Sequence, residues 1–258
     1  MAGILPAFFK VSIYLQLKKI IMKKFLFNAQ AKGGTGKSML TYLMALKNET
    51  NERSYFIDLD SSVKTSAHQL KFLQGKQPPR FAIMNLLDIR DKIDRQLLFE
   101  NLLELSKKEY DEFYFDFGAP ESDQLPSLFS KDYNIEEFRQ IQDELNAKFV
   151  FNVIVAGGGA YEASTKYLQK IVDLISGAFE VNIYINQASF ANHQHLIDEL
   201  KYYASVRKNK INSVNLFGDF DITTAPHKNI LNLIEQGKGI ESYVFVEKIK
   251  IQKELSKL

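Results

Sequence analysis

The chain has 258 residues, of which 33 are Lys or Arg and 31 are Asp or Glu, so its formal net charge at pH 7 is only +2. This balance excludes the strong excess of one charge that by itself indicates a polyanionic partner. The length suits one large α/β domain better than two. There is no cysteine, which excludes disulfide bonds, thiolate zinc sites and cysteine-held iron–sulfur clusters and fits a reducing compartment, so we expect a cytoplasmic protein.

The first 21 residues are mostly apolar but contain one proline and three lysines. They are too short and too interrupted for a membrane span. Their lysines follow the apolar part, whereas in a secretory signal the basic residues precede it. Two interpretations stay open: an upstream extension or start-site artefact, with Met22 as the natural start, or an amphipathic segment that contacts a membrane surface or a partner. We favour the first and expect one domain over residues 22–258, preceded by an N-terminal extension over residues 1–21.

A glycine-rich loop follows the first apolar run of this domain. Phe25–Phe27 predicts a strand and residues 38–47 predict a helix. The residues between them match the spacing G-x-x-x-x-G-K-[ST], with Ala31 in place of the first glycine. A strand, such a loop and a helix in this order are typical of phosphate-binding loops. The residues that we expect to bind a nucleotide here are Gly33, Gly34, Thr35, Gly36, Lys37, Ser38 and Met39.

The residue types of this loop suit a nucleotide phosphate. Glycines allow consecutive backbone N–H groups to approach a phosphate that a Cβ would obstruct, and the helix start adds unpaired donors and a positive dipole end. Lys37 would reach the β- and γ-phosphates, and the Ser38 hydroxyl would bind Mg²⁺. The alternative is a glycine-rich turn without a ligand. The Lys-Ser pair between a strand and a helix favours nucleotide binding over that alternative.

The rest of the chain alternates between predicted strands and helices. Several strands are continuously apolar, which favours a doubly wound, mainly parallel α/β sheet with helices on both faces. We predict strands over 54–60, 112–116, 149–155, 180–185 and 213–217, and helices over 94–108, 135–145, 196–207 and 226–236, with a long helix ending near residue 175. Residues 121–134 are predicted to be turn-rich. The last nineteen or so residues predict a closing helix whose apolar residues seal the core, namely Val244, Phe245, Val246, Ile249 and Leu255.

Three aspartates follow predicted strands. Asp116 ends a hydrophobic strand in the Walker B pattern, whose carboxylate holds Mg²⁺ directly or through water. Asp58 and Asp60 end another strand about twenty residues past Lys37, where an acid can orient the attacking water or join the metal shell. Because the carboxyl ends of parallel strands meet at one edge of a sheet, these acids are expected near the loop. Each aspartate can instead cap a helix or turn. Our metal candidates are Ser38, Asp58 and Asp116.

The segment Lys32–Ser38 resembles the deviant Walker A motif of the ParA/MinD family of ATPases, in which a lysine precedes the first glycine. The similarity continues in the same order along residues 23–258. Further similar segments are Phe56–Asp60, Tyr110–Asp116, Tyr184–Asn186 and the late loop Thr224–Pro226 with the helix after it. This resemblance implies a P-loop ATPase fold of the ParA/MinD type with ATP and Mg²⁺ as cofactors.

The resemblance also implies residue roles. Lys32 would reach across a dimer interface to the partner's nucleotide, and Asp60 would position the attacking water, so the implied catalytic residues are Lys32, Lys37 and Asp60. Asn186 and Pro226 would contact or close over the adenine. The chain departs from the family at Phe117–Pro120, where Thr-Pro-Pro is usual, and at Ser61–Ser62, where Pro-Gln is frequent. The role of the switch segment that follows the Walker B aspartate in this family, and the partner protein that recognises it, therefore stay open.

Two functions are consistent with these motifs. The first is an ATP-dependent dimerising switch that positions, partitions or transfers plasmid or other mobile-element DNA, nearest to the ParA-like ATPases of plasmid stability and conjugation (StbB and TraL types). It would form a homodimer through ATP and use an adaptor or centromere-binding partner. The second is a small-molecule ligase or kinase of the dethiobiotin-synthetase kind. Lys32 discriminates between them, because such an enzyme needs no lysine in trans.

Direct binding to non-specific DNA is a weaker expectation. Two groups of basic residues could follow phosphates, although solvated helix faces explain them at least as well. Binding to a membrane is not expected. The two groups are Lys201, Arg207, Lys208 and Lys210, and Lys248, Lys250, Lys253 and Lys257.

Overall fold

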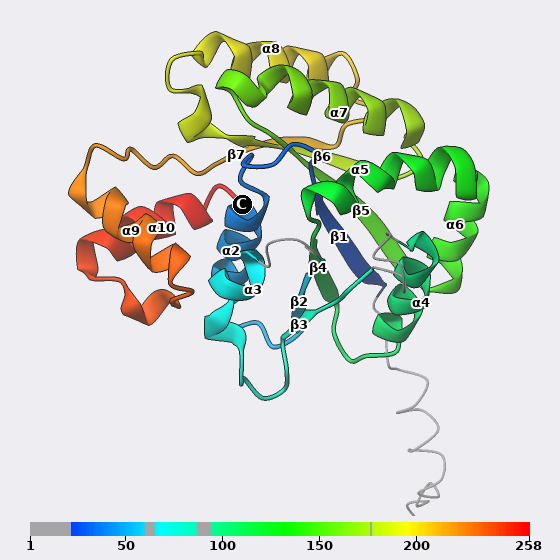
Figure 1. The fold of residues 1–258 in the computed structure, drawn as a ribbon, viewed down its shortest axis with the longest axis horizontal. Helices are drawn as coiled ribbons and strands as arrows, with labels where there is room; N and C mark the ends of the chain where they lie inside the picture. Colours follow the sequence, from blue (N-terminus) through cyan, green and yellow to red (C-terminus); the bar gives the residue numbers. More distant parts are fainter. Residues whose placement is uncertain (1–21, 60–64, 87–93, 176) are drawn as a thin grey trace, which may run out of the picture.

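The computed structural model describes residues 22–59, 65–86, 94–175 and 177–258. Within them, parallel strands form one sheet in the order β3-β2-β4-β1-β5-β6-β7 (Figure 1). The predicted parallel α/β fold is therefore confirmed. The strands are β1 (Lys23–Ala29), β2 (Ser54–Asp58), β3 (Phe81–Ile83), β4 (Glu112–Asp116), β5 (Ala147–Val155), β6 (Glu180–Asn186) and β7 (Ser213–Phe217).

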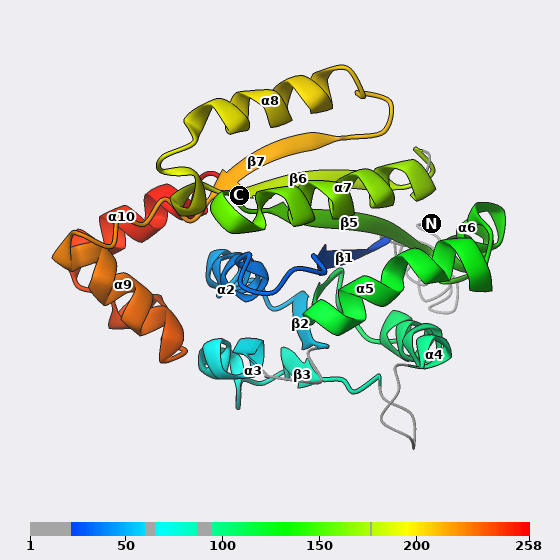
Figure 2. The same ribbon diagram turned by 45° about the horizontal axis from the view of Figure 1, so that its top comes forward.

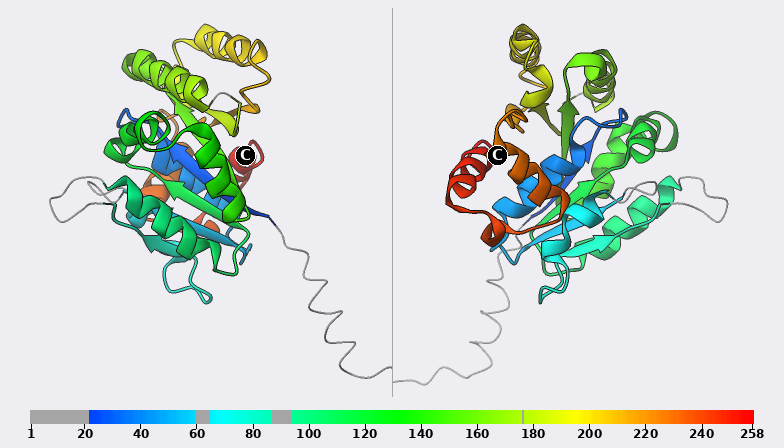
Figure 3. Two further views of the ribbon diagram at one scale, coloured as in Figure 1. Left: turned by 90° about the vertical axis from the view of Figure 1, so that its right-hand side faces the viewer. Right: turned by 60° about the vertical axis from the view of Figure 1, so that its left-hand side comes forward.

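Helices cover both faces of the sheet (Figure 2). One face packs against α4 to α8, and the other against α2, α9 and α10, with α3 beside α2. Figure 3 shows α9 and α10 next to α2. The helices are α2 (Lys37–Lys47), α3 (Thr65–Gln69), α4 (Arg95–Ser106), α5 (Ala119–Ser127), α6 (Ile135–Glu144), α7 (Tyr161–Ile175), α8 (Gln194–Ser205), α9 (Ala225–Glu235) and α10 (Phe245–Leu255).

The central strand β1 contributes to both cores because successive side chains of a strand point to opposite faces. Phe25 and Phe27 are buried toward α4 to α8. Their rings lie 4.9 Å from Phe113 and 5.1 Å from Phe151, centroid to centroid, in the neighbouring strands. Leu26 packs against the α2 side. This two-sided burial holds the end of β1, where the glycine-rich loop begins, in a fixed place in the sheet.

The prediction of a turn-rich segment over 121–134 is wrong. Helix α5 occupies its first half, and one turn of π-helix, Leu128–Asp132, follows. Pro120 lies in the first turn of α5, where its missing N–H costs no helical hydrogen bond. Leu125 and Leu128 are buried in the core. Burial of these two side chains therefore outweighs the turn-forming residues around them.

The prediction that the apolar residues of the last helix seal the core is also wrong for most of them. Phe245 is 77% exposed, and Val244, Val246 and Ile249 are exposed as well. The helix is turned so that Ile251 and Glu254 are buried. The Glu254 carboxylate accepts a hydrogen bond of 3.0 Å from the Gly218 backbone N–H after β7, which explains that orientation. No helix among the described residues is both long and apolar enough to cross a membrane.

Candidate functional site

The loop between β1 and α2 depends on two glycines with positive φ. Gly34 has φ 73° and Gly36, immediately before α2, has φ 101°. Residues with a Cβ avoid backbone conformations with such positive φ angles. A Cβ on Gly36 would also lie 2.7 Å from the Asn186 Nδ2 atom, whereas a Cβ on Gly33 would have no neighbour within 4 Å. The loop is therefore open at Gly33 and Gly34 and closely packed at Gly36.

The predicted phosphate-binding lysine points back to the end of β1. Lys37 is only 8% exposed, and its Nζ donates a hydrogen bond of 2.9 Å to the Gln30 backbone carbonyl. The Gln30 side chain is itself buried, donates to the Ile154 carbonyl at 2.6 Å and accepts from the Lys32 N–H at 3.3 Å. Gln30 was not among the predicted site residues, although a polar residue directly after an apolar strand was a usable signal. The Lys32 side chain is exposed.

Ser38 and Asp116, two of the predicted metal ligands, are in direct contact. The Ser38 hydroxyl donates a hydrogen bond of 2.7 Å to Asp116 Oδ2, and Ser66, which the sequence did not point to, donates to the same oxygen. Asp116 is 1% exposed, and its Oδ1 atom has no hydrogen-bond partner within the described part of the chain. A buried carboxylate oxygen without a partner is costly, and a divalent cation would satisfy it.

The charge state of Asp116 depends on this environment. Burial raises the pKa of its carboxyl group to about 6, while the hydrogen bonds from Ser66 and Ser38 lower it and the nearby Asp58 raises it. A cation bound to this carboxylate would favour the ionised form and lower the pKa again. The residues at this position therefore fit the Mg²⁺ ion that the motif predicts.

Asp58 lies beside Asp116, because the two residues are paired in the register of β2 and β4. Its Oδ2 atom accepts a hydrogen bond of 2.7 Å from the Ala67 backbone N–H in α3. This contact is the helix-capping role that the sequence left open as an alternative, and the metal role of Asp58 stays a prediction. Asp60 lies outside the described residues, so its catalytic role also stays a prediction.

Asn186, at the end of β6, reaches the loop from the other side. Its Nδ2 atom donates a hydrogen bond of 3.0 Å to the Thr35 carbonyl, and its Oδ1 atom is buried without a hydrogen-bond partner among the described residues. Gly218 packs here as well: a Cβ on it would lie 3.1 Å from Asn186 Oδ1 and 3.4 Å from Met39 Sδ. Asn186 and Met39 therefore both lie beside Gly218. Pro226 lies half-buried in the first turn of α9, and its adenine contact stays a prediction.

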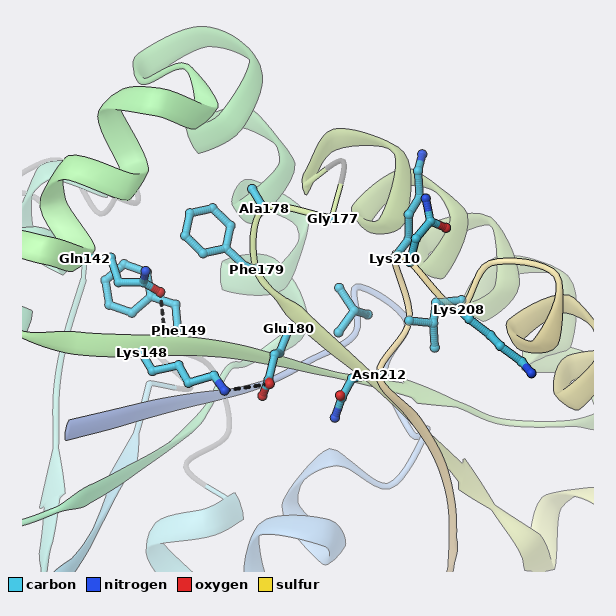
Figure 4. Close-up of a pocket in the computed structure, with 13 residues that line it drawn as sticks. Gln142, Lys148, Phe149, Gly177, Ala178, Phe179, Glu180, Lys208, Lys210 and Asn212 are labelled. Carbon is cyan, nitrogen blue, oxygen red and sulfur yellow. Dashed lines mark hydrogen bonds and ion pairs between the residues drawn. The ribbon is translucent and has the colours of Figure 1, made fainter. Parts of the chain in front are cut away.

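A hollow of about 270 Å³ lies at the opposite end of the sheet (Figure 4). Lys148 and Glu180, at the starts of β5 and β6, form an ion pair of 2.6 Å across it, and the Gln142 side chain accepts from the Phe149 N–H at 2.8 Å. Figure 4 shows Lys208 pointing away from this pair. Because the glycine-rich loop lies at the carboxyl ends of the strands, this hollow is separate from it.

No family model and no curated protein sequence matches this chain. Solved structures of similar shape include the MinC:MinD cell division protein complex of Aquifex aeolicus (13% identity, 91% of this chain and 94% of that chain, TM-score 0.49). They also include a plasmid partition protein of Borrelia burgdorferi (14%, 83% and 96%, TM-score 0.46) and a ParA family ATPase of Chlorobium tepidum (13%, 92% and 100%, TM-score 0.45). At these identities and scores, the fold assignment rests on the strand order and the loop geometry described above.

Proposed function

We propose that this protein is a Mg²⁺-dependent ATPase of the ParA/MinD type, in which ATP joins two subunits and hydrolysis separates them. The observation that carries this proposal is the contact between Ser38 and Asp116 behind the glycine-rich loop, with one oxygen of Asp116 buried and without a hydrogen-bond partner among the described residues. When bound, Mg²⁺ supplies positive charge to the phosphate oxygens of the nucleotide.

The residues of the site have separate tasks in this proposal. The backbone N–H groups from Gly33 to Ser38 bind the phosphates. Lys37 exchanges its hydrogen bond to the Gln30 carbonyl for one to a phosphate, which is a short movement for a long side chain already at the loop. Ser38 and Asp116 hold the cation. The Asn186 side chain supports the loop at Thr35 and offers its remaining oxygen to the nucleotide base.

In this proposal, the exposed Lys32 is the residue through which ATP changes the protein from one subunit to two. Its side chain is exposed to solvent, so its charge can serve a nucleotide bound by a second subunit, as an arginine finger does in trans. Asp60 would then place the water in its own subunit. ATP thus favours an assembled state that hydrolysis removes.

We further propose that the assembled state acts on plasmid or mobile-element DNA, through an adaptor or centromere-binding partner, in the cytoplasm. The support is the resemblance of the loop to the ParA-like ATPases. The basic residues near α8 give limited support for direct DNA binding. Lys201 is 3.5 Å from Asp198, and the Arg207 guanidinium stacks on the Tyr203 ring at 4.1 Å, so both are already engaged within the chain.

Size-exclusion chromatography with Mg²⁺ and ATP, together with phosphate release, tests the proposal. Wild type is expected to form dimers with ATP and to hydrolyse it. Lys32→Ala should bind ATP but lose both dimerisation and hydrolysis, whereas Asp60→Ala should accumulate as an ATP-bound dimer. Lys47→Ala, at the other end of α2 and also exposed, is the matched control and should behave like wild type.

The alternative enzyme gives a different result. If wild type and Asp60→Ala stay monomeric with ATP and Lys32→Ala hydrolyses normally, the switch is refuted. Such a result would favour a small-molecule kinase or ligase on the same fold. If wild type binds no ATP at all, both functions are refuted.

A further inference from the structure

An apolar groove of about 530 Å³ lies between α4 and α6, away from the glycine-rich loop. Its floor consists of Phe99, Leu103, Tyr133, Ile141 and Leu145. Leu103 is 45% exposed, and the Phe99 and Tyr133 rings meet edge to face at 4.8 Å. Figures 1 and 2 show the two helices on the same side of the sheet. Contiguous exposed apolar surface with a polar rim is typical of an interaction site.

The rim of this groove is acidic. Helix α6 has the sequence IEEFRQIQDE, which contains four acidic residues and one arginine. Glu137 and Glu144 line the groove directly and are exposed. On the α4 side the exposed Glu100 and Glu104 add negative charge, of which Glu104 is paired with Lys107. The groove therefore suits an occupant that is apolar and basic.

The start of β1 is fixed at one end of the groove. The Lys23 N–H donates a hydrogen bond of 3.2 Å to the Asn146 carbonyl, just after α6. The Lys23 ammonium group donates one of 2.5 Å to the Ser106 carbonyl at the end of α4. Leu145 is adjacent to Asn146 in the chain, and Leu103 is three residues before Ser106, about one helical turn or roughly 5 Å along α4. The chain that precedes Lys23 thus starts from the mouth of the groove.

The residues before this point have the composition that the groove requires. Residues 1–21 contain three lysines and no acidic residue, and the part nearest to β1 includes Val11, Ile13, Leu15, Leu17 and Ile20. We propose that the groove between α4 and α6 binds residues 1–21 of the same chain, with their apolar side chains on the groove floor and their lysines at the acidic rim. The proposal does not rest on the ATPase function.

The covalent connection makes this occupant more favourable than a separate molecule of the same composition. A segment attached at Lys23 loses no translational freedom of its own on binding, and its concentration at the groove is set by the length of the connection. Its docking would bury the exposed part of Leu103 and pair otherwise solvated charges. On this proposal, residues 1–21 belong to the working protein, whereas the favoured interpretation of the sequence was an upstream extension.

Disulfide trapping in the full-length chain tests the proposal, because the chain has no cysteine of its own. One pair places cysteines at Leu17→Cys and Gln140→Cys, on the groove rim. The control pair combines Leu17→Cys with Lys107→Cys, an exposed position next to the same chain exit but outside the groove. A segment that does not bind the groove would meet Lys107→Cys at least as often. Docking predicts that the Gln140 pair oxidises roughly tenfold faster than the Lys107 pair.

Two further variants connect this preference to the groove itself. Leu103→Lys removes an apolar contact and repels the lysines, and Glu144→Lys reverses an exposed charge on the rim. Each should bring the two oxidation rates close together, with circular dichroism confirming that the protein is folded. Equal rates in the original pairs, or a preference that both variants leave unchanged, would overturn the proposal. Disulfide-linked dimers as the main product would assign the groove to a second copy and overturn it as well.

Discussion

The two ends of the central sheet differ in how their polar groups are satisfied. At the carboxyl end, Asp116 Oδ1 and Asn186 Oδ1 are buried without a hydrogen-bond partner among the described residues. At the amino end, charged side chains are paired with each other: Lys148 with Glu180 at 2.6 Å and Lys24 with Glu112 at 3.1 Å. Buried polar atoms without partners are rare in folded proteins because they are costly. The carboxyl end is therefore the end that leaves binding capacity for a ligand.

The comparison shows that lysine content alone does not identify the site. Both ends have a lysine, but Lys37 is 8% exposed and donates a hydrogen bond to a backbone carbonyl, whereas Lys148 is half-exposed and forms an ion pair with a carboxylate. The hydrogen bond from Lys37 to the Gln30 carbonyl can be exchanged for one to a phosphate, because a charged acceptor makes the stronger hydrogen bond. Lys148 lies at the start of β5, at the opposite end of the sheet from the glycine-rich loop, so its ammonium group is not placed to make this exchange.

The largest expected effect is the difference in ATP affinity between two variants, in which either Lys37 or Lys148 is replaced by alanine. Lys37→Ala should weaken Mg·ATP binding by about 100-fold or more, because a hydrogen bond to a charged phosphate contributes up to about 3 kcal/mol. Lys148→Ala, the matched lysine at the other end, should leave the ATP affinity within about twofold, since an exposed ion pair contributes little. Isothermal titration calorimetry measures both. Similar affinities for the two variants would contradict the distinction between the two ends.

The second effect concerns backbone conformation within the loop. Gly36→Ala should lower the free energy of unfolding by about 2 kcal/mol, because a residue with a Cβ pays about 1–2 kcal/mol at a positive φ and the added Cβ would lie 2.7 Å from Asn186 Nδ2. Gly33→Ala is the control, since its Cβ would meet nothing within 4 Å. Urea unfolding without nucleotide measures both variants. An equal loss at the two positions would mean that the loop is uniformly strained and that the contact with Asn186 is unimportant.

A third, smaller effect tests the Asp116 carboxylate, whose Oδ1 atom has no hydrogen-bond partner among the described residues. Asp116→Asn keeps the size of the side chain but removes its charge, so the Mg²⁺ concentration needed for ATP binding should rise about tenfold. Titration of Mg²⁺ at fixed ATP measures this change. An unchanged Mg²⁺ requirement would show that the cation is held elsewhere.

The same variant has a pH signature without nucleotide. Burial raises the pKa of the folded-state Asp116 to about 6 from the ordinary 3.8, so the wild-type protein loses stability as the pH rises between these values and this carboxyl group ionises. Asp116→Asn cannot ionise. Its stability relative to wild type should therefore increase between pH 4 and pH 7, measured by urea unfolding at both values. A difference in the free energy of unfolding between variant and wild type that is the same at both pH values would mean that ionisation of Asp116 does not cause the loss of stability.

The sequence was sufficient for the parts of the structure whose physical signal is local. Strand β4 and strand β7 begin and end where the apolar pattern predicted, and the loop is identified by a fixed spacing of glycine, lysine and serine. The contact between Ser38 and Asp116 joins residues far apart in the chain, yet it was predictable because parallel strands bring their carboxyl ends to one edge.

The elements that the sequence missed have weak or conflicting local signals. Strand β3 has only three residues and none is buried, and α3 has only five, so neither shows a periodic pattern. The orientation of α10 depends on a hydrogen bond between Glu254 and the backbone after β7, a tertiary contact that overrides the apolar pattern of the helix. Ser66 contacts Asp116 only because of where α3 is placed, and no feature of its own sequence indicates it.

The smallest expected effect tests whether the charges at the amino end are satisfied by the chain itself. The Arg53 guanidinium donates to both oxygens of Asp111, at 2.5 Å for the Nη2–Oδ1 contact, and this hydrogen bonding holds the pKa of Asp111 below its ordinary value. A group whose pKa is lower in the folded state stabilises the protein at pH values above its unfolded-state pKa. This stabilisation is lost as the pH falls through the folded-state pKa. Arg53→Ala should therefore cost about 0.5 kcal/mol at pH 7 and progressively less below pH 4, because an exposed pair contributes little and only when Asp111 is ionised. Urea unfolding of both proteins at pH 7 and at pH 3 measures the difference, with Mg·ATP affinity at pH 7 expected to be unchanged. A loss of stability that is the same at both pH values would show that Arg53 acts by packing, and a loss of ATP affinity would break the separation between the two ends.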